Sequence, residues 1–360
     1  MAKTILVPVD GSALSERAVG YASVLAGRLA ANVVLMRAVL TIKPHSADDE
    51  RFNAEAIQEA EAELQKLAAT CSAQAVSGET VVWHDEAGWA IVEAARQRHA
   101  DLIVMSTHGR SGLGRWLYGS VADRVLRSAD SPIILLPPGA RNDWSLAAPF
   151  RMVIAVDGSE FAEQAVEPAT ELAKAMGAEV RLVAAVDPPY YWVGPEAYAV
   201  YDPAVERDAA QEYADSIAAR MGKHGVTTTV EVTWGTPDRV ILESARQTES
   251  HLIVLATHGR GGLARLAMGS VTQAVLHRST LPIMILRPAG VREKARTEEV
   301  PIAMPAAPLA AVAMSPFDVT VAQRALAHFL ENDSPTDDER RAAGGLIERL
   351  GNVFAFAAVS

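Results

Sequence analysis

The stretch Ile5–Val19 reads ILVPVDGSALSERAV, and the same pattern returns at Met152–Val166 as MVIAVDGSEFAEQAV. In both places a short run rich in β-branched residues ends at Asp-Gly-Ser, and an amphipathic segment follows. Asp-Gly-Ser is typical of a strand that turns into a helix, with an Asx turn at Asp10 and Ser12 as the N-cap. The pattern therefore predicts a strand–turn–helix unit that occurs twice.

The later segments of the chain repeat in the same order. NVVLMRAV at Asn32–Val39 returns as EVRLVAAV at Glu179–Val186. AIVEAARQRHADLIVMSTHGR, from Ala90, returns as VILESARQTESHLIVLATHGR, from Val240, and SPIILLPPG returns as LPIMILRPAG. Two homologous halves therefore cover residues 1 to about 290.

Short apolar runs alternate with amphipathic stretches within each half. The strands predicted in the first half are Ile5–Val9, Val33–Val39, Thr80–Trp83, Leu102–Met105 and Ile133–Leu136. Such alternation gives a mostly parallel sheet with helices on both faces. We expect an α/β protein with two tandem three-layer α/β/α sandwiches, each with a five-stranded sheet, at residues 1–140 and 150–290.

Two further segments lie outside these halves. Asn142–Pro149, NDWSLAAP, has the polar residues and the proline of a short linker. Residues 291–360 include the Pro- and Ala-rich stretch Val300–Pro316, which is typical of an extended connector. Apolar spacing over Phe317–Leu330 and an N-cap at Ser334 favour two helices, so we expect a short helical C-terminal tail.

Composition excludes several classes of protein. The chain has 360 residues, and its 33 Lys and Arg against 44 Asp and Glu give a net charge of −11, which argues against a nucleic-acid partner. A single cysteine, Cys71, cannot form an internal disulfide, which fits a protein in a reducing compartment. We expect Cys71 to be a small residue on a helix. The apolar run Ile5–Val9 is too short for a signal peptide or a membrane span. We expect a cytoplasmic protein with no membrane partner.

One longer phrase suggests a binding site. THGRSGLGRWLYGS at Thr107–Ser120 returns as THGRGGLARLAMGS at Thr257–Ser270, and each copy directly follows a predicted strand. Ligands of open parallel sheets bind beyond the carboxyl ends of the strands, where the strand order reverses. Gly109 and Gly112 allow backbone N–H groups to converge on an anion, and Gly119-Ser120 begins a helix whose N-terminal amides favour phosphate. The phrase therefore predicts a phosphate site in each half.

Each of these features also has a purely structural interpretation. Asp10 is placed to accept hydrogen bonds from ribose hydroxyls, and it is equally suited to making the turn before the helix. His108 and His258 are suited to fixing their loops by hydrogen bonds. Arg110 and Arg260 either hold phosphate or are solvated. These alternatives stay open from the residues alone.

Each half resembles a universal stress protein domain, and the chain looks like a tandem two-domain member of that family with an added C-terminal segment. The family's ATP-binding pattern is Gly, two residues, Gly, nine residues, Gly and then Ser or Thr. This chain supplies the last three positions twice, and Ser106 and Ala256 replace the first glycine. The resemblance implies the fold of the adenine nucleotide α-hydrolases and ATP as the ligand, with Mg²⁺ carried on its phosphates.

The resemblance also implies two sets of nucleotide-binding residues. In both halves, residues that end the first two strands would contact ribose and adenine, and residues of the glycine-rich phrase would surround the phosphates. The first set is Pro8, Asp10, Ala38, Val39, Ser106, His108, Gly109, Arg110, Gly112, Gly119, Ser120 and Val121. The second set is Ala155, Asp157, Ala185, Val186, Asp187, Ala256, His258, Gly259, Arg260, Gly262, Gly269, Ser270 and Val271.

Common catalytic motifs are absent from the sequence, which has no GxxxxGK[ST], GxSxG, HExxH or CxxC string. We therefore assign no catalytic residue and no protein-held metal. The prediction is a cytoplasmic stress-response regulator that binds ATP or a related adenine nucleotide in one or both domains. We expect a homodimer, which pairs through the final strands or the tail, with an unidentified protein partner. The alternatives are a nucleotide-free dimeric scaffold and a weak ATPase.

Overall fold

The computed structural model describes residues 4–41, 47–73, 76–107, 119–140, 144, 149–186, 203–256 and 269–287. The predicted helical tail at 291–360 lies outside the described residues. So does the predicted linker, except for Trp144 and Pro149.

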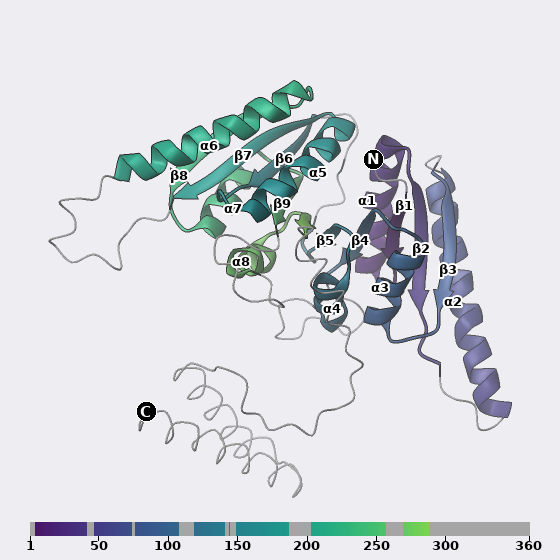
Figure 1. Ribbon diagram of the computed structural model, residues 1–360. Coiled ribbons are helices and arrows are strands. Elements are labelled where there is room, and N and C mark those ends of the chain that lie inside the picture. Colours follow the sequence, from purple (N-terminus) through teal and green to yellow (C-terminus); the bar gives the residue numbers. More distant parts are fainter. Residues whose placement is uncertain are drawn as a thin grey trace, which may run out of the picture. The chain divides into compact units, whose positions relative to one another are not determined.

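The two halves have the same succession of strands and helices (Figure 1). The first half contains β1 (Thr4–Pro8), α1 (Ala13–Leu29), β2 (Asn32–Ala38), α2 (Ala47–Ala73), β3 (Gly78–Trp83), α3 (Ala87–Gln97), β4 (Leu102–Ser106), α4 (Ser120–Ser128) and β5 (Ile133–Leu136). The second contains β6 (Phe150–Ala155), α5 (Glu160–Met176), β7 (Ala178–Val186), α6 (Pro203–Lys223), β8 (Thr227–Trp234), α7 (Pro237–Gln247), β9 (Leu252–Ala256), α8 (Ser270–Arg278) and β10 (Ile283–Leu286). All five strands predicted for the first half are confirmed.

The strands form one sheet in the order β3-β2-β1-β4-β5-β10-β9-β6-β7-β8. Strand pairs within each half are parallel, whereas β5 and β10 pair antiparallel, with Ile134 opposite Met284. The two expected five-stranded sheets are therefore halves of a continuous ten-stranded sheet. β5 is paired with β4 and β10, and β10 is paired with β5 and β9, so neither final strand has an open edge for a second chain. This contradicts the expectation that a homodimer pairs through the final strands.

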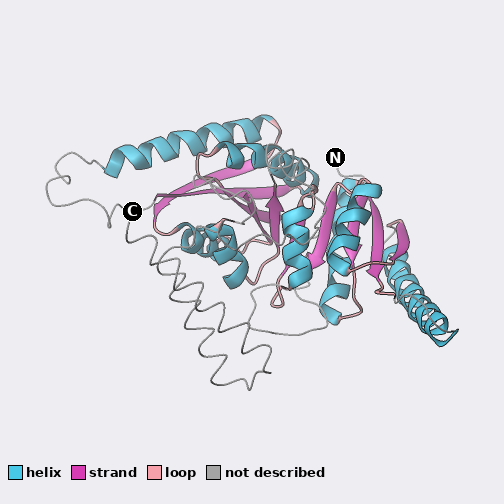
Figure 2. Cartoon of the chain, turned by 60° about the horizontal axis from the view of Figure 1, so that its bottom comes forward, coloured by secondary structure: helices cyan, strands magenta, loops and turns pink. Residues whose placement is uncertain are grey.

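Helices cover both faces of the sheet, as predicted for a three-layer α/β/α architecture (Figure 2). One hydrophobic core lies between the sheet and helices α1, α2, α5 and α6, and it includes Leu25, Leu64 and Ile217. The other lies between the sheet and α3, α4, α7 and α8, and it includes Ile91 and Leu126. Each core contains residues of both halves, so the halves share their interior on both faces.

Trp144, in the segment expected to be a linker, is buried with 6% of its surface exposed. Its ring packs edge-on against Tyr21 of α1, at 4.7 Å between centroids, and against Phe150 of β6, at 5.0 Å. Its indole N–H donates to the carbonyl oxygen of His251 at 3.2 Å. The connection between the halves is therefore anchored in the core by an aromatic side chain.

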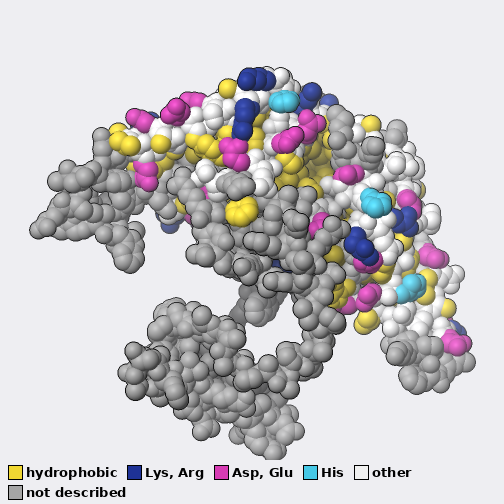
Figure 3. Space-filling view, viewed as in Figure 1, with side chains coloured by type: hydrophobic (Ala, Val, Ile, Leu, Met, Phe, Trp, Pro, Cys, Tyr) yellow, Lys and Arg dark blue, Asp and Glu magenta, His cyan; other side chains and the backbone are white. Residues whose placement is uncertain are grey.

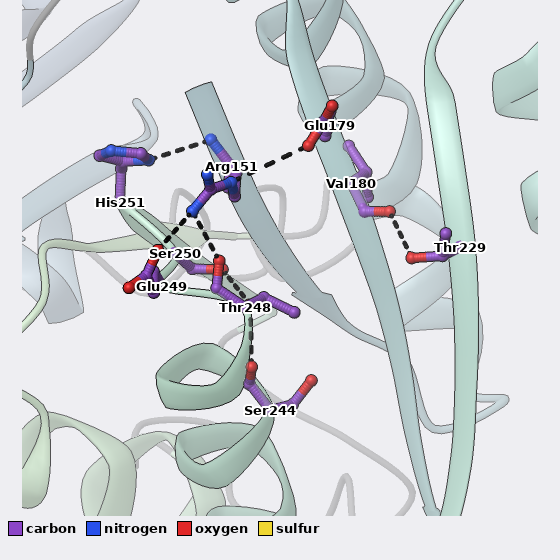
Figure 4. A network of polar contacts seen from close by, with 9 residues as sticks. All are labelled: Arg151, Glu179, Val180, Thr229, Ser244, Thr248, Glu249, Ser250 and His251. Atoms are coloured by element: carbon purple, nitrogen blue, oxygen red, sulfur yellow. Dashed lines mark hydrogen bonds and ion pairs between the residues drawn. The ribbon is translucent and has the colours of Figure 1, made fainter. Parts of the chain in front are cut away.

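A polar network surrounds Arg151 near the amino ends of β6 and β9 (Figure 4). The backbone N–H of Arg151 donates to Nδ1 of His251 at 3.0 Å, and its guanidinium contacts the Thr248 carbonyl at 3.2 Å and the Glu249 carboxylate at 3.1 Å. Because this network lies at the ends of the strands opposite to the predicted ligand site, we assign it a structural role.

Cys71 lies in α2 as a buried free thiol, as expected of a small helical residue. Among the helices of the described ranges, none combines the length and the apolar character needed to span a membrane.

Candidate functional site

The strand order places one candidate site in each half. β1 and β4 are neighbours in the first half, and β2 and β5 lie on their outer sides, so the strand order reverses between β1 and β4. β6 and β9 are the matching pair in the second half. Ligands of open parallel sheets bind beyond the carboxyl ends of such a pair. Because β5 and β10 are antiparallel, the strands of the two halves run in opposite directions. The carboxyl ends of the strands, and with them the two candidate sites, therefore lie at opposite ends of the strands.

The turn after β1 is built as the sequence predicts. The Ser12 N–H donates to Asp10 Oδ1 at 3.0 Å, and the Ser15 N–H donates to Ser12 Oγ at 3.2 Å, so Ser12 is the N-cap of α1. Gly11 has a φ of 78°, a left-handed conformation that favours glycine. The turn-making role of Asp10 is thereby confirmed, and its contact with a nucleoside stays a prediction.

The second half repeats this turn with one change. The Ser159 N–H and Oγ both donate to Asp157 Oδ1, at 3.0 and 2.6 Å, and Ser159 caps α5. Ser15 of the first half, whose hydroxyl accepts a hydrogen bond from the Asp10 N–H at 3.2 Å, is replaced by Ala162. The two candidate sites are therefore similar in backbone and different in their hydroxyl groups.

The helices that follow β4 and β9 begin without a capping side chain. Gly119, the N-cap of α4, has φ −63° and ψ 154°, and Gly269, the N-cap of α8, has φ −57° and ψ 146°. Since glycine carries no side-chain oxygen, neither N-cap residue offers a side-chain acceptor to the amides of the first helical turn. The Gly119 N–H donates to the Thr107 carbonyl at 2.7 Å, so this amide supports the base of the loop.

Among the described residues, none requires glycine at 119. Its φ is open to every residue, and of the described atoms an added Cβ would meet only the Thr107 carbonyl oxygen, at 3.4 Å. A missing side chain that neither the conformation nor the described neighbours explain favours the close approach of a ligand to the start of α4. Ser120 is exposed there.

Ser106 and Ala256, which replace the family's first glycine, are the last residues of β4 and β9. Ser106 pairs with Leu136 in the sheet, and Ala256 pairs with Leu286. Both are ordinary strand residues without a positive φ. The conformation at this position therefore does not require glycine.

The apolar residues predicted to contact the nucleotide lie at the ends of the first two strands of each half and, for the phosphate contacts Val121 and Val271, in the helices after β4 and β9. Pro8 and Ala38 are the last residues of β1 and β2, and Val39 is buried directly after β2. Ala38 and Val121 are half-buried against the core beneath α3 and α4. In the second half Ala155 ends β6, Ala185 and Val186 are the last two residues of β7, and Val271 is half-buried against the same core.

Nine of the predicted contacts lie outside the described residues. They are His108, Gly109, Arg110, Gly112, Asp187, His258, Gly259, Arg260 and Gly262. Their predicted roles stay predictions.

Tyr213 of α6 lies near the turn of the second half, and no motif in the sequence indicated it. Burial raises the pKa of Tyr213 to about 12, and the negative charges of Glu163 and Asp157 add to this effect. Its neighbours Ala214, Ile217 and Met221 are buried at helical spacing, so sequence periodicity alone would assign Tyr213 to a core face.

The described residues form no candidate metal centre, and charges of both signs are mixed on the face seen in Figure 3. Among the described residues, no group of three or more His, Cys, Asp or Glu side chains is arranged to hold a metal ion. On the face shown in Figure 3, acidic and basic side chains are interspersed over the described surface.

Comparison with known proteins identifies relatives of both halves. The model of the universal stress protein family matches residues 1–137 and 150–287. A universal stress protein of Mycolicibacterium smegmatis is 27% identical over 299 residues, which cover 79% of this chain and 97% of that protein. Universal stress protein Rv2005c of Mycobacterium tuberculosis is 29% identical over 196 residues, which cover 52% of this chain and 62% of that protein.

Solved structures show the same fold. A universal stress protein from Archaeoglobus fulgidus superposes with a TM-score of 0.59 at 20% identity, covering 79% of this chain and 98% of the other. Protein PA1789 of Pseudomonas aeruginosa superposes with a TM-score of 0.60 at 17% identity, covering 82% of this chain and 98% of the other. At these identities the likeness establishes the architecture alone.

Proposed function

Because the chain belongs to the universal stress protein family, we propose that it binds ATP or a related adenine nucleotide at the carboxyl ends of β1 and β4, and again at those of β6 and β9. The phosphates lie against the start of α4 or α8. The nucleoside lies over the apolar ends of the first two strands. Mg²⁺ accompanies the phosphates and is not held by a protein site of its own.

A contrast between helix starts within the chain carries this proposal. The helices after β1 and β6 are capped by Ser12 and Ser159, whose hydroxyls accept hydrogen bonds from amides of the first turn. The helices after β4 and β9 begin at Gly119 and Gly269 with a similar extended N-cap conformation, and these N-cap residues have no side chain that could cap the helix. Helices α3 and α7 also begin without a side-chain cap, from Glu86 and Thr236, but they follow the outer strands β3 and β8. The glycine starts of α4 and α8 lie at the strand-order reversal, where N-terminal amides favour an anionic ligand.

Two observations favour the alternative of a nucleotide-free scaffold. The Asp10 carboxylate is engaged in the turn before α1, and the Gly119 amide is engaged by Thr107. If both groups served only the fold, function would lie in protein contacts. A weak ATPase is a lesser alternative, for which we assign no catalytic residue.

The cellular role that we propose is a cytoplasmic stress-response regulator that works as a homodimer, in which nucleotide occupancy changes the affinity for a protein partner. The free thiol of Cys71 supports a reducing compartment. The dimer forms through surfaces other than β5 and β10, which are already paired. Cell fractionation and light scattering of the purified chain test location and assembly.

Mass spectrometry of small molecules released from freshly purified, denatured protein tests nucleotide binding, together with calorimetric titration with ATP and Mg²⁺. We expect a bound adenine nucleotide, or saturable ATP binding. An absence of nucleotide in the preparation combined with no heat of binding at millimolar ATP would establish the scaffold alternative.

A further inference from the structure

Arg124 is the middle residue of α4 and is held against the first turn of α3, which packs beside α4 (Figure 1). Its guanidinium carbon is 5.0 Å from the centroid of the Trp89 ring, and its Nε is 3.6 Å from the Glu86 carboxylate. The side chain also passes over Gly88, where an added Cβ would come within 2.6 Å of Arg124 Cδ. Aromatic stacking, an ion pair and a glycine together keep the guanidinium in this position.

Helix geometry brings this guanidinium close to the proposed phosphate site. Ser120, the first residue of α4, and Arg124 are four residues apart, so they share one face of the helix with Cβ atoms about 5–6 Å apart. Side chains on a helix lean toward its N-terminus, which directs Arg124 toward Ser120. The Arg124 side chain is 38% exposed, which leaves its donors accessible to a ligand.

The second half lacks this arrangement. Ala274 stands at the position of Arg124, Asp238 at that of Gly88 and Arg239 at that of Trp89. The nearest guanidinium on the same face of α8 is that of Arg278, one turn further from Ser270, and Asp238 holds it in an ion pair. Within α4 and α8, the two halves therefore differ in positive charge at this position of the helix.

We propose that Arg124 contacts the outer phosphates of a nucleotide bound in the first half, and that it makes this site, but not the second, selective for the number of phosphates. This inference rests on the proposed nucleotide binding. In the free protein Glu86 neutralises Arg124, and the nucleotide phosphates replace Glu86 when they bind. The Trp89 ring keeps the guanidinium planar and oriented during this exchange.

The test measures affinities of the first site alone, in the full-length chain with Gly269→Asp to block the second site. ATP, ADP, AMP and adenosine are titrated against Arg124→Ala, Arg124→Lys and the parent. Because a charged hydrogen bond contributes about 1.5–3 kcal/mol, Arg124→Ala should weaken ATP binding by at least about tenfold and adenosine binding by less than about twofold. Arg124→Lys should recover part of the loss.

Two further variants distinguish phosphate contact from a structural effect. Glu86→Gln removes the competing carboxylate and should strengthen ATP binding by about two- to fivefold, the range of exposed ion pairs. Arg127→Ala is the matched control, because Arg127 carries the same charge on α4 but pairs with Asp123 at 2.9 Å near the other end of the helix. It should leave the preference for ATP over adenosine unchanged.

Tryptophan fluorescence gives a second readout. ATP should change the emission of the parent, and Trp89→Phe should remove most of that change. Equal losses for ATP and adenosine in Arg124→Ala, or an equal effect of Arg127→Ala, would overturn the inference and leave nucleotide binding intact. A parent that binds no nucleotide in this half would overturn the inference as well, and a wild type that binds none at either site would overturn the proposed function too.

Discussion

Replacing Gly119 by aspartate should stabilise the free protein while it abolishes nucleotide binding in the first half. Gly119 has nearly the same backbone conformation as the capping residues Ser12 and Ser159, with φ −63° against −82° and −79°. An aspartate there would accept hydrogen bonds from the first amides of α4. Among the described residues, its Cβ would meet only the Thr107 carbonyl oxygen, at 3.4 Å, so these neighbours need not rearrange.

The expected gain combines two effects. Aspartate exceeds glycine as an N-cap by a few tenths of a kcal/mol, and a negative charge at a helix N-terminus adds about 0.3–1 kcal/mol. The free energy of unfolding should therefore rise by about 0.5–1 kcal/mol, which raises the melting temperature by about 1–4 °C for a unit of this size. The same carboxylate would occupy the phosphate position and repel ATP, so affinity should fall by more than about tenfold.

Thermal unfolding without ligand and calorimetric titration with ATP measure the two effects in a Gly269→Asp background. Gly119→Ala is the control, because alanine adds a Cβ without a capping oxygen. Stability should rank Asp above Gly above Ala, and ATP affinity should rank Gly above Ala above Asp. An aspartate variant that binds ATP as well as the parent would refute a phosphate position at this helix start.

Three more predictions concern stability. Trp144→Ala should lower the free energy of unfolding by about 3–5 kcal/mol in urea denaturation, because a buried aromatic anchor is lost. Arg287→Ala should lower it by about 1–2 kcal/mol, because the Arg287 guanidinium donates to the Ala129 carbonyl beyond the end of α4. Between pH 10 and 12 the wild type should lose stability that Tyr213→Phe retains. The raised pKa of Tyr213, about 12, means that the folded state holds the phenol proton more tightly than the unfolded state does. This contribution to the free energy of unfolding is fully present below pH 10 and is lost as the pH rises from 10 to 12.

The strands and the turns after them could be predicted because their determinants are local. Short β-branched runs define β1 and β2, and Asp10 and Ser12 make a turn from side-chain hydrogen bonds to neighbouring amides. The start of α4 at Gly119 and Ser120 was also predicted correctly, from the Gly-Ser pair itself, although no side-chain cap forms there. Such interactions depend on residues a few positions apart, which the sequence displays directly.

A polar sequence pattern that occurs in both halves does not by itself indicate a ligand site. The two halves also share a Glu, Arg and Gln pattern in α3 and α7, where the Glu93 carboxylate accepts a hydrogen bond from Arg96 at 2.6 Å, and Glu243 accepts one from Arg246 at 2.6 Å. These are exposed pairs one helical turn apart, with no ligand implied. A repeated polar pattern can therefore be a property of the helix surface.

Contacts between distant residues could not be predicted. The burial of Trp144 depends on Tyr21 and Phe150, and the position of Arg124 depends on the missing side chain of Gly88. Periodicity within one segment carries no information about which segments meet. The nine predicted ligand contacts that lie outside the described residues stay predictions.

The junction between β5 and β10 has an evolutionary consequence. In an assembly of two identical subunits, every change at a twofold interface occurs twice, so a contact that suits only one side cannot be selected alone. Covalent fusion removes that coupling. Pro137 and Arg287 occupy matching positions after β5 and β10, yet only Arg287 has a guanidinium to donate across the junction. One half of the molecule can thus change at a junction position while its counterpart keeps a different residue.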